Sequence, residues 1–315
     1  MELVFGPVPS RRLGRSLGVN NIPPPKKCSY SCIYCQIGRT WELTIERRSF
    51  HDPWSVAEAV SLKISEVGGQ VDYVTFVPDG EPTLDENLGE EARRVKAVVE
   101  KPLAILTNSS LIFRDDVRSD LMAFDLVSLK MDAASKDVWR RINRPHPSLS
   151  LDEILRGARK FAGEFPGELI TETMLIEKVN DDLTEIEAIA DLVAELEPRK
   201  AYLAIPTRPP AESWAKPASE ETIVKAYEIF KERLGSGRVE LLIGYEGSGF
   251  DLGENPVENI LAIASVHPIM IDYAYQALSR FREDPEKIIT ELVQSGLLKL
   301  VKYRGMSFLV RSWRG

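Results

Sequence analysis

The sequence contains no long hydrophobic run. No apolar stretch approaches the ~20 residues that a helix needs to cross a bilayer, and residues 1–10 lack the basic stretch and apolar core of a secretory signal. We therefore expect a cytoplasmic protein without a membrane segment. A chain of 315 residues, 43% of them hydrophobic, is long enough for one large core or for a core and a small second domain.

Positive charge is outnumbered by negative charge, with 40 Lys and Arg against 48 Asp and Glu. The net charge of −8 argues against a non-specific nucleic-acid coat, which needs many Lys and Arg contacts to phosphates. The charge is unevenly spread, because residues 1–50 carry eight Lys or Arg against three Glu. A local basic patch and scattered solvated charges are both consistent with this distribution.

Cysteine is rare and clustered. The chain has three cysteines, Cys28, Cys32 and Cys35, all within eight residues. A disulfide framework needs an even number of cysteines in a secreted chain, and a structural zinc site needs four ligands, usually in two separated pairs. A Cys3His zinc site is therefore only a weak alternative. The histidines available for it are His51, His146 and His267.

Three thiolates on one short loop can bind three irons of a cubane cluster and leave the fourth iron open. The spacing C-x3-C-x2-C, with Tyr34 before the third cysteine, resembles the signature loop of the radical S-adenosylmethionine (SAM) superfamily. The resemblance implies a [4Fe-4S] cluster on Cys28, Cys32 and Cys35 whose open iron chelates SAM. It also implies reductive cleavage of SAM to a 5′-deoxyadenosyl radical that abstracts hydrogen from a substrate.

Apolar runs alternate with helical stretches along most of the chain. Asp52 and Pro53 predict the start of a helix that extends to about residue 67, and another helix is expected at 183–195. This alternation predicts an α/β fold, a partial (β/α)6 TIM-like barrel with functional loops at the carboxyl ends of its strands. The expected strands are 17–19, 71–77, 103–107, 126–131, 169–176 and 201–205, with a last apolar run at 239–243.

A turn follows the second of these strands. Asp79-Gly80-Glu81-Pro82 resembles the Gly-Gly-Glu-Pro motif of the same superfamily, with Asp in place of the first glycine. In that superfamily the motif receives the amino group of SAM through backbone carbonyls and an acidic side chain. The resemblance therefore assigns these four residues to SAM binding.

Polar residues also follow the third and fourth strands. In the superfamily such positions contact the ribose and carboxylate of SAM, which favours Asn108, Ser128 and Lys130 here. A structural pairing of Lys130 with Asp132 is the alternative. After the sixth strand, a proline-rich loop carries Arg208, Trp214 and Lys216, which either bind substrate over the barrel mouth or belong to a rigid loop with solvated cations.

Two basic segments have alternative interpretations. The run Arg140-Arg-Ile-Asn-Arg-Pro-His146 contacts an anionic substrate or is an exposed turn. After a glycine-rich linker, three helices and a hairpin predict a winged-helix-like domain at 248–315, behind a barrel domain at 1–247. The basic hairpin of this domain could bind nucleic acid. Alternatively, the domain binds another protein or supports the barrel structurally.

A radical SAM group related to the wyosine-base-forming tRNA enzymes resembles this chain over most of its length. The resemblance rests on the opening segment at 5–18, the Arg-Ile-Asn-Arg-Pro-His run at 141–146 and the winged-helix-like C-terminal part. Those enzymes carry a second cluster on further cysteines, which this sequence lacks. The candidate substrates are a tRNA base, a glycyl-radical partner protein or a small metabolite. An acidic flavodoxin or ferredoxin is the expected electron donor. The non-enzyme alternative is a winged-helix regulator that senses redox state through its cluster without cleaving SAM.

Overall fold

The structure is a computed structural model that describes residues 3–244, 252, 255–281 and 284–312. Most of the expected glycine-rich linker and the expected domain boundary at 247/248 lie outside these residues. Among the described residues, no helix is both long enough and apolar enough to span a membrane.

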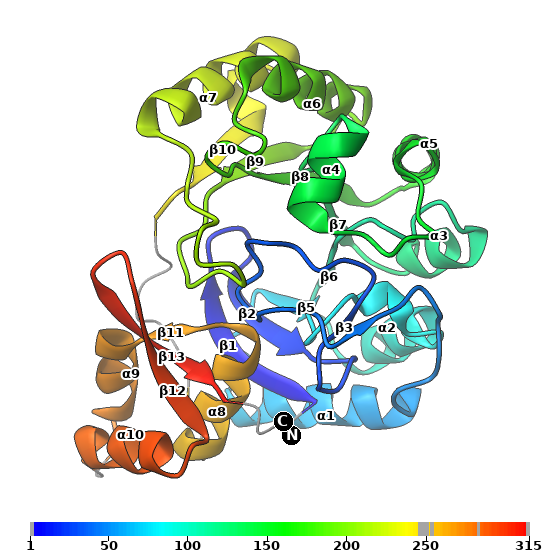
Figure 1. Cartoon of the computed structure of the whole chain (residues 1–315). Helices are drawn as coiled ribbons and strands as arrows, with labels where there is room; N and C mark the ends of the chain where they lie inside the picture. The colour runs from blue at the N-terminus through cyan, green and yellow to red at the C-terminus, as the bar shows by residue number, and fades with distance from the viewer. Residues whose placement is uncertain (1–2, 245–251, 253–254, 282–283, 313–315) are drawn as a thin grey trace.

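A curled eight-stranded sheet forms the larger part of the molecule (Figure 1). Its strand order is β1-β2-β5-β6-β7-β8-β9-β10, in which β1 pairs antiparallel with β2 and all later pairs are parallel. This arrangement confirms the predicted α/β partial barrel. The strands are β1 (Val4–Ser10), β2 (Gly14–Val19), β5 (Tyr73–Phe76), β6 (Leu103–Thr107), β7 (Leu126–Lys130), β8 (Glu168–Met174), β9 (Lys200–Ala204) and β10 (Val239–Leu242).

The sheet is larger than the six strands expected for the barrel. The apolar run at 239–243 joins it as β10, parallel to β9. Strand β1 escaped prediction because Gly6, Pro7 and Pro9 interrupt its pattern. Proline is tolerated on edge strands, and the register of β1 shifts between Phe5 and Val8 as at a bulge.

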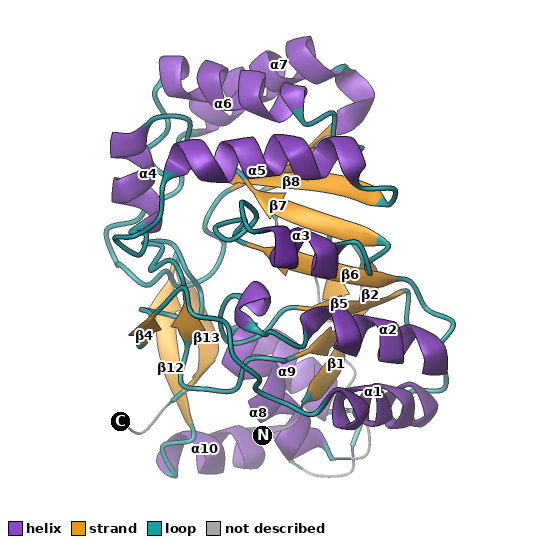
Figure 2. Cartoon of the chain, turned by 90° about the vertical axis from the view of Figure 1, so that its right-hand side faces the viewer, coloured by secondary structure: helices purple, strands orange, loops and turns teal. Residues whose placement is uncertain are grey.

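Helices connect the parallel strands and cover one face of the sheet (Figure 2). The first begins where the sequence predicts, because the side chain of Asp52 accepts a hydrogen bond from the backbone N–H of Ser55 and Pro53 occupies the first turn. The helices are α1 (Pro53–Glu66), α2 (Leu88–Val98), α3 (Asp115–Leu121), α4 (Lys136–Asn143), α5 (Leu151–Glu164), α6 (Leu183–Glu195) and α7 (Glu220–Leu234), with short 3-10 turns at Pro82–Leu84 and Ser236–Arg238.

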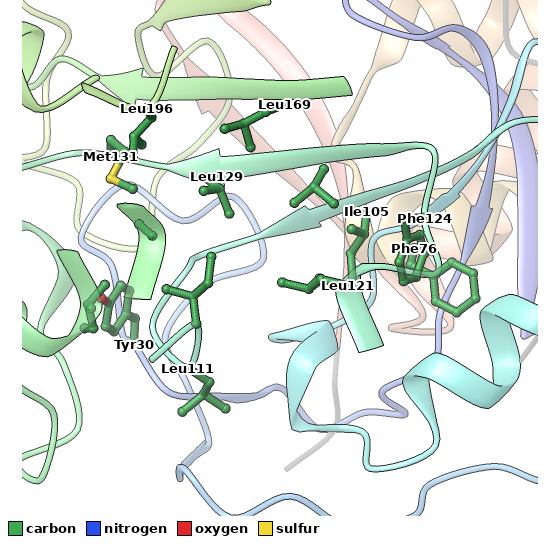
Figure 3. Packing of buried hydrophobic residues seen from close by; sticks show 14 of the residues in the cluster. Tyr30, Phe76, Ile105, Leu111, Leu121, Phe124, Leu129, Met131, Leu169 and Leu196 are labelled. Atoms are coloured by element: carbon green, nitrogen blue, oxygen red, sulfur yellow. The ribbon is translucent and has the colours of Figure 1, made fainter. Parts of the chain in front are cut away.

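The main hydrophobic core lies between the sheet and these helices. Phe76 of β5 meets Phe124 edge to face, with ring centroids 5.2 Å apart. Ile105 of β6, Leu121 of α3 and Leu129 of β7 are fully buried in the same cluster (Figure 3). Because this core anchors consecutive strands, it also sets the positions of the loops at their carboxyl ends.

The C-terminal segment forms a smaller module with its own antiparallel sheet, ordered β11-β13-β12. Its buried residues share a core with Phe5 and Val8, so the module packs against the edge strand β1 (Figure 1). Its elements are α8 (Pro256–Val266), β11 (Ile269–Met270), α9 (Ile271–Leu278), α10 (Pro285–Gln294), β12 (Leu298–Tyr303) and β13 (Met306–Arg311). A separate two-stranded pair, β3 (Lys27–Cys28) and β4 (Glu42–Leu43), lies in the loop after β2.

Candidate functional site

A cavity of about 330 Å³ lies at the carboxyl ends of the parallel strands. The cysteine loop and residues 8–13 line the cavity, together with residues on or directly after β5, β6, β7, β8 and β9. Barrel folds place binding and catalytic groups at this end because the connecting loops converge there. The predicted site residues that line the cavity are Cys28, Cys32, Cys35, Gly80, Glu81, Asn108, Ser128, Lys130 and Arg208.

Each cysteine sulfur has a nitrogen donor of its own. The Lys26 ammonium lies 3.1 Å from Sγ of Cys35. The side-chain amide of Asn108 lies 3.4 Å from Sγ of Cys28, and that of Asn143 lies 3.4 Å from Sγ of Cys32. N–H groups around sulfur stabilise the thiolate and, in metal sites, the charge of the bound metal group.

Burial makes bare thiolates unfavourable at this site. It raises the pKa of Cys28 to about 11 and that of Cys32 to about 12. Lys26 is buried too, and burial alone would lower its pKa, but the three nearby cysteine sulfurs together raise it. The loop therefore needs positive charge to hold its cysteines as thiolates, as a bound metal group supplies.

The donor set is suited to a cluster. In the part of the chain that the structure describes, no group of three or more His, Cys, Asp or Glu is placed to hold a metal ion. A cubane cluster does not require its cysteines to meet at one ion, because each thiolate binds a different iron. The three sulfurs on a shared cavity wall are compatible with that mode of binding.

Glu81 lies at the centre of the turn after β5. Its Oε1 accepts hydrogen bonds from the Thr107 hydroxyl at 2.5 Å and from the Thr83 hydroxyl at 2.6 Å. Its Oε2 accepts from the backbone N–H of Asn108 at 2.8 Å. Burial raises the pKa of this carboxyl, although these hydrogen bonds oppose the rise. The side chain therefore ties the turn to the end of β6 and also borders the cavity.

The other residues of the turn have different positions. Asp79 and Pro82 are buried but are not among the described residues that line the cavity. The carboxylate and backbone N–H of Asp79 both pair with the side chain of Asn20. Gly80 lies against the backbone, since a Cβ atom there would come within 1.8 Å of the carbonyl oxygen of Lys27. Only Gly80 and Glu81 of the four thus border the cavity.

Lys130 extends into a charged wall of the cavity. Its ammonium forms an ion pair with Glu172, and Arg12 pairs with the same carboxylate. The Lys130 ammonium also lies 5.2 Å from the centre of the Tyr34 ring, a cation–π distance. Burial lowers its pKa. The expected alternative pairing with Asp132 does not form.

Asp132 instead anchors the cysteine loop. Its carboxylate accepts hydrogen bonds from the Tyr34 hydroxyl and from the Asn143 amide, the latter at 2.9 Å. Its other oxygen accepts from the backbone N–H of Met174 at 2.9 Å. The aromatic residue before Cys35 is thereby linked to the ends of β7 and β8.

The C-terminal module borders the cavity through His267. Arg208 donates a hydrogen bond to the Gln36 side chain at 2.9 Å, and its other terminal nitrogen lies 2.8 Å from Nε2 of His267. Gln36, next to Cys35, also donates to the backbone carbonyl of Val266 at 2.8 Å. The cysteine loop, the loop after β9 and the C-terminal module thus meet at one point.

Two residues predicted to bind substrate lie elsewhere. Trp214 is 46% exposed, Lys216 is exposed, and neither is among the described residues that line the cavity. The backbone carbonyl of Lys216 accepts a hydrogen bond from Glu177 at 2.9 Å. The sequence analysis had grouped Arg208, Trp214 and Lys216 as candidate substrate contacts. Of these three, only Arg208 lines the cavity.

Sequence reasoning missed several residues of the site. Lys26 was counted only as part of a basic segment, and Asn143 only as part of a basic run. Gln36 belonged to no motif, and Arg12 was counted only within the basic opening segment. Position beside the cysteines could have drawn attention to Lys26 and Gln36, whereas the approach of Asn143 depends on the fold.

Comparisons with known proteins agree with this geometry. A family model described as the radical SAM superfamily matches residues 22–193. The UPF0026 protein of Methanocaldococcus jannaschii is 45% identical over 313 residues, which cover 99% of this chain and 97% of that protein. A UPF0026 protein of Helicobacter pylori strain J99 is 32% identical over 234 residues, which cover 73% of this chain and 74% of that protein.

Solved structures share the fold at lower identity. The structure of TYW1 with a lysine-pyruvate adduct bound aligns with a TM-score of 0.51 and 19% identity. The alignment covers 69% of this chain and 73% of that one. At this identity the likeness concerns the fold alone.

Proposed function

The chain belongs to the radical SAM superfamily and to its UPF0026 group, and from this premise we propose that Cys28, Cys32 and Cys35 ligate the [4Fe-4S] cluster of a SAM-cleaving enzyme. When bound, the cluster supplies the electron that cleaves SAM to a 5′-deoxyadenosyl radical, which abstracts a hydrogen atom from substrate. The observation that carries the proposal is the single cavity wall that presents all three sulfurs, each with its own nitrogen donor.

We assign SAM to the strand-end residues of the same cavity. Gly80 and Glu81 would receive its amino group, because a carboxylate and nearby carbonyl oxygens suit an ammonium. Asn108, Ser128 and Lys130 would hold its ribose and carboxylate. Asp79 and Pro82 belong to this assignment as residues that shape the turn, since both are buried outside the cavity lining described above.

For the substrate, we propose hydrogen abstraction from a tRNA base, a glycyl-radical partner protein or a small metabolite. Arg208 is the candidate substrate contact, since it borders the cavity and lies on a loop rather than on a strand. The charged wall of Arg12, Lys130 and Glu172 borders the same space. Membership of an enzyme superfamily favours catalysis over the alternative of a redox-sensing regulator.

We further propose that the C-terminal module is a winged-helix-like domain and that the domains divide at 247/248. The order helix, short strand, two helices and a hairpin, from α8 to β13, supports this assignment. The shared core with Phe5 and Val8, and His267 at the cavity, favour a structural role for the module beside the active site.

The proposal is tested by anaerobic reconstitution with iron and sulfide, reduction with dithionite, addition of SAM and chromatography for 5′-deoxyadenosine. Cys32→Ala is the control, and product formation should require Cys32. A cluster-loaded wild-type protein that forms no 5′-deoxyadenosine would favour the regulator, and product from the Cys32 variant would reject the assignment of the cluster ligands.

A further inference from the structure

Two segments distant from the cysteine loop in sequence lie against its outer side. The backbone N–H of Ile33 donates to the carbonyl of Ile142 at 3.0 Å, which places residues 140–144 on one flank. The backbone N–H of Glu212 donates to the carbonyl of Ile33 at 2.9 Å, which places residues 212–216 beside them. Both segments therefore contact the loop that carries the cluster ligands.

A third segment, residues 39–44, is hydrogen-bonded to the backbone at the start of the cysteine loop. The backbone N–H of Trp41 donates to the carbonyl of Lys26 at 3.1 Å, and that of Thr44 donates to the carbonyl of Cys28 at 3.0 Å. The segment is thus attached to the backbone of a cluster ligand. We call the three segments together the cysteine-loop rim.

A single carboxylate connects all three parts of the rim. Glu212 accepts two hydrogen bonds from Arg39, at 3.1 and 3.0 Å, and one from Arg144 at 2.5 Å. Its own side chain is 9% exposed, whereas that of Arg39 is 72% exposed. The buried carboxylate of Glu212 therefore holds two of the rim cations, Arg39 and Arg144, and joins the three segments into one surface.

The composition of the rim is typical of a protein-binding surface. Trp41 is 73% exposed and Trp214 is 46% exposed, and Trp and Arg are enriched in interfaces. The three segments carry five Lys or Arg and two Glu, although the chain as a whole has a net charge of −8. Such a local excess of positive charge attracts acidic partners. The cations are Arg39, Arg140, Arg141, Arg144 and Lys216.

The rim does not open into the active-site cavity. None of the described residues that line the 330 Å³ cavity belongs to it. A nucleic acid bound to the rim alone would not contact the described lining of the cavity. An electron needs no channel, only a donor close to the cluster, and the rim is attached directly to the cysteine loop.

We propose that the cysteine-loop rim is the docking surface for an acidic one-electron carrier protein that reduces the cluster. This inference rests on the proposed function. One electron passes from the reduced carrier to the cluster, so the carrier is oxidised and the cluster reduced by one electron each, and no bond changes. Complementary charge guides the carrier onto the rim, and the exposed tryptophans provide apolar contact.

The test compares two double variants with equal changes of net charge. Arg141→Glu with Lys216→Glu reverses two rim cations, and Lys225→Glu with Lys231→Glu reverses two cations on α7, of which Lys225 is exposed and Lys231 is half-buried. Each reconstituted protein is mixed anaerobically with reduced flavodoxin, reduced ferredoxin or dithionite, and loss of the cluster absorbance is followed by stopped flow. We expect the rim variant to accept electrons from the acidic carriers at least about tenfold more slowly than wild type at low salt.

The salt dependence and the chemical reductant complete the test. The deficit of the rim variant should narrow as ionic strength rises, because screening removes the attraction, while its reduction by dithionite matches wild type. The proposal would be overturned if electron transfer from the carriers slowed equally in both double variants or in neither. It would also be overturned if neither carrier reduced the wild-type cluster. Loss of tRNA binding with unchanged carrier kinetics would assign the rim to nucleic acid instead. Failure of dithionite-reduced wild type to cleave SAM would count against the proposed function rather than the docking surface.

Discussion

A buried pair of carboxyl groups beneath the turn after β5 gives a sharp prediction of pH-dependent stability. Asp85 follows the 3-10 turn, Glu91 lies on α2, and both side chains are fully buried together with that of Asn21. Burial, followed by the charge of Asp85, raises the pKa of Glu91 to about 9, and burial raises that of Asp85 to about 6. Glu91 is therefore protonated at neutral pH in the folded protein.

The sign of the effect follows from proton binding. Glu91 has an ordinary pKa of 4.5 in the unfolded chain and about 9 in the folded protein. Between these values the folded state binds one proton more than the unfolded state, so stability falls as pH rises. The slope is about 1.4 kcal/mol per pH unit for one proton. The stabilisation from this group is complete below pH 4.5 and is lost by about pH 9.

Glu91→Gln removes the titration but keeps the size and a hydrogen-bond donor. Unfolding in urea, followed by far-UV circular dichroism at pH 7.0, 7.5 and 8.0, should show the variant gaining on wild type by about 1.4 kcal/mol over that single unit. The window lies above the ordinary pKa of histidine. Taking the difference between the two proteins cancels the contributions that other groups make equally to both.

Glu90→Gln, one residue earlier on the same helix, is the matched control. Glu90 is 40% exposed and pairs with Arg93 and Arg94 on the surface. Its replacement should change the free energy of unfolding by no more than about 1 kcal/mol, with the same pH slope as wild type. Parallel stability curves for wild type and Glu91→Gln between pH 7 and 8 would refute the conclusion that Glu91 is protonated in the folded protein at neutral pH.

Two further predictions concern the cavity. Lys26→Met removes the positive charge beside Cys35, so the midpoint potential of the reconstituted cluster, followed by electron paramagnetic resonance, should fall; an unchanged potential would show that this charge does not act on the cluster. Glu81→Ala should leave the iron content unchanged but weaken SAM binding measured by equilibrium dialysis, because the turn loses its hydrogen bonds to Thr107 and Asn108. Glu81→Gln should lose less SAM affinity than Glu81→Ala. Wild-type affinity for SAM in the alanine variant would reject the role of this carboxylate in SAM binding.

Local signals in the sequence predicted much of the fold. Apolar runs located the parallel strands, and Asp52 marked a helix start at which its side chain caps the backbone. These signals depend on neighbours within a few residues, so they are visible without the fold. Strand β1 was missed because prolines on an edge strand remove the pattern that identifies interior strands.

The sequence by itself determined the cysteine spacing, the turn at Gly80 and Glu81, and the alternation of strands and helices that predicted a partial barrel. Only the tertiary structure decided that Asn143 reaches Cys32, that Glu172 rather than Asp132 pairs with Lys130, and that Trp214 and Lys216 lie outside the cavity lining. These outcomes depend on contacts between residues far apart in the chain. Such contacts follow from the register of neighbouring strands and the packing of loops, which no short window of sequence contains.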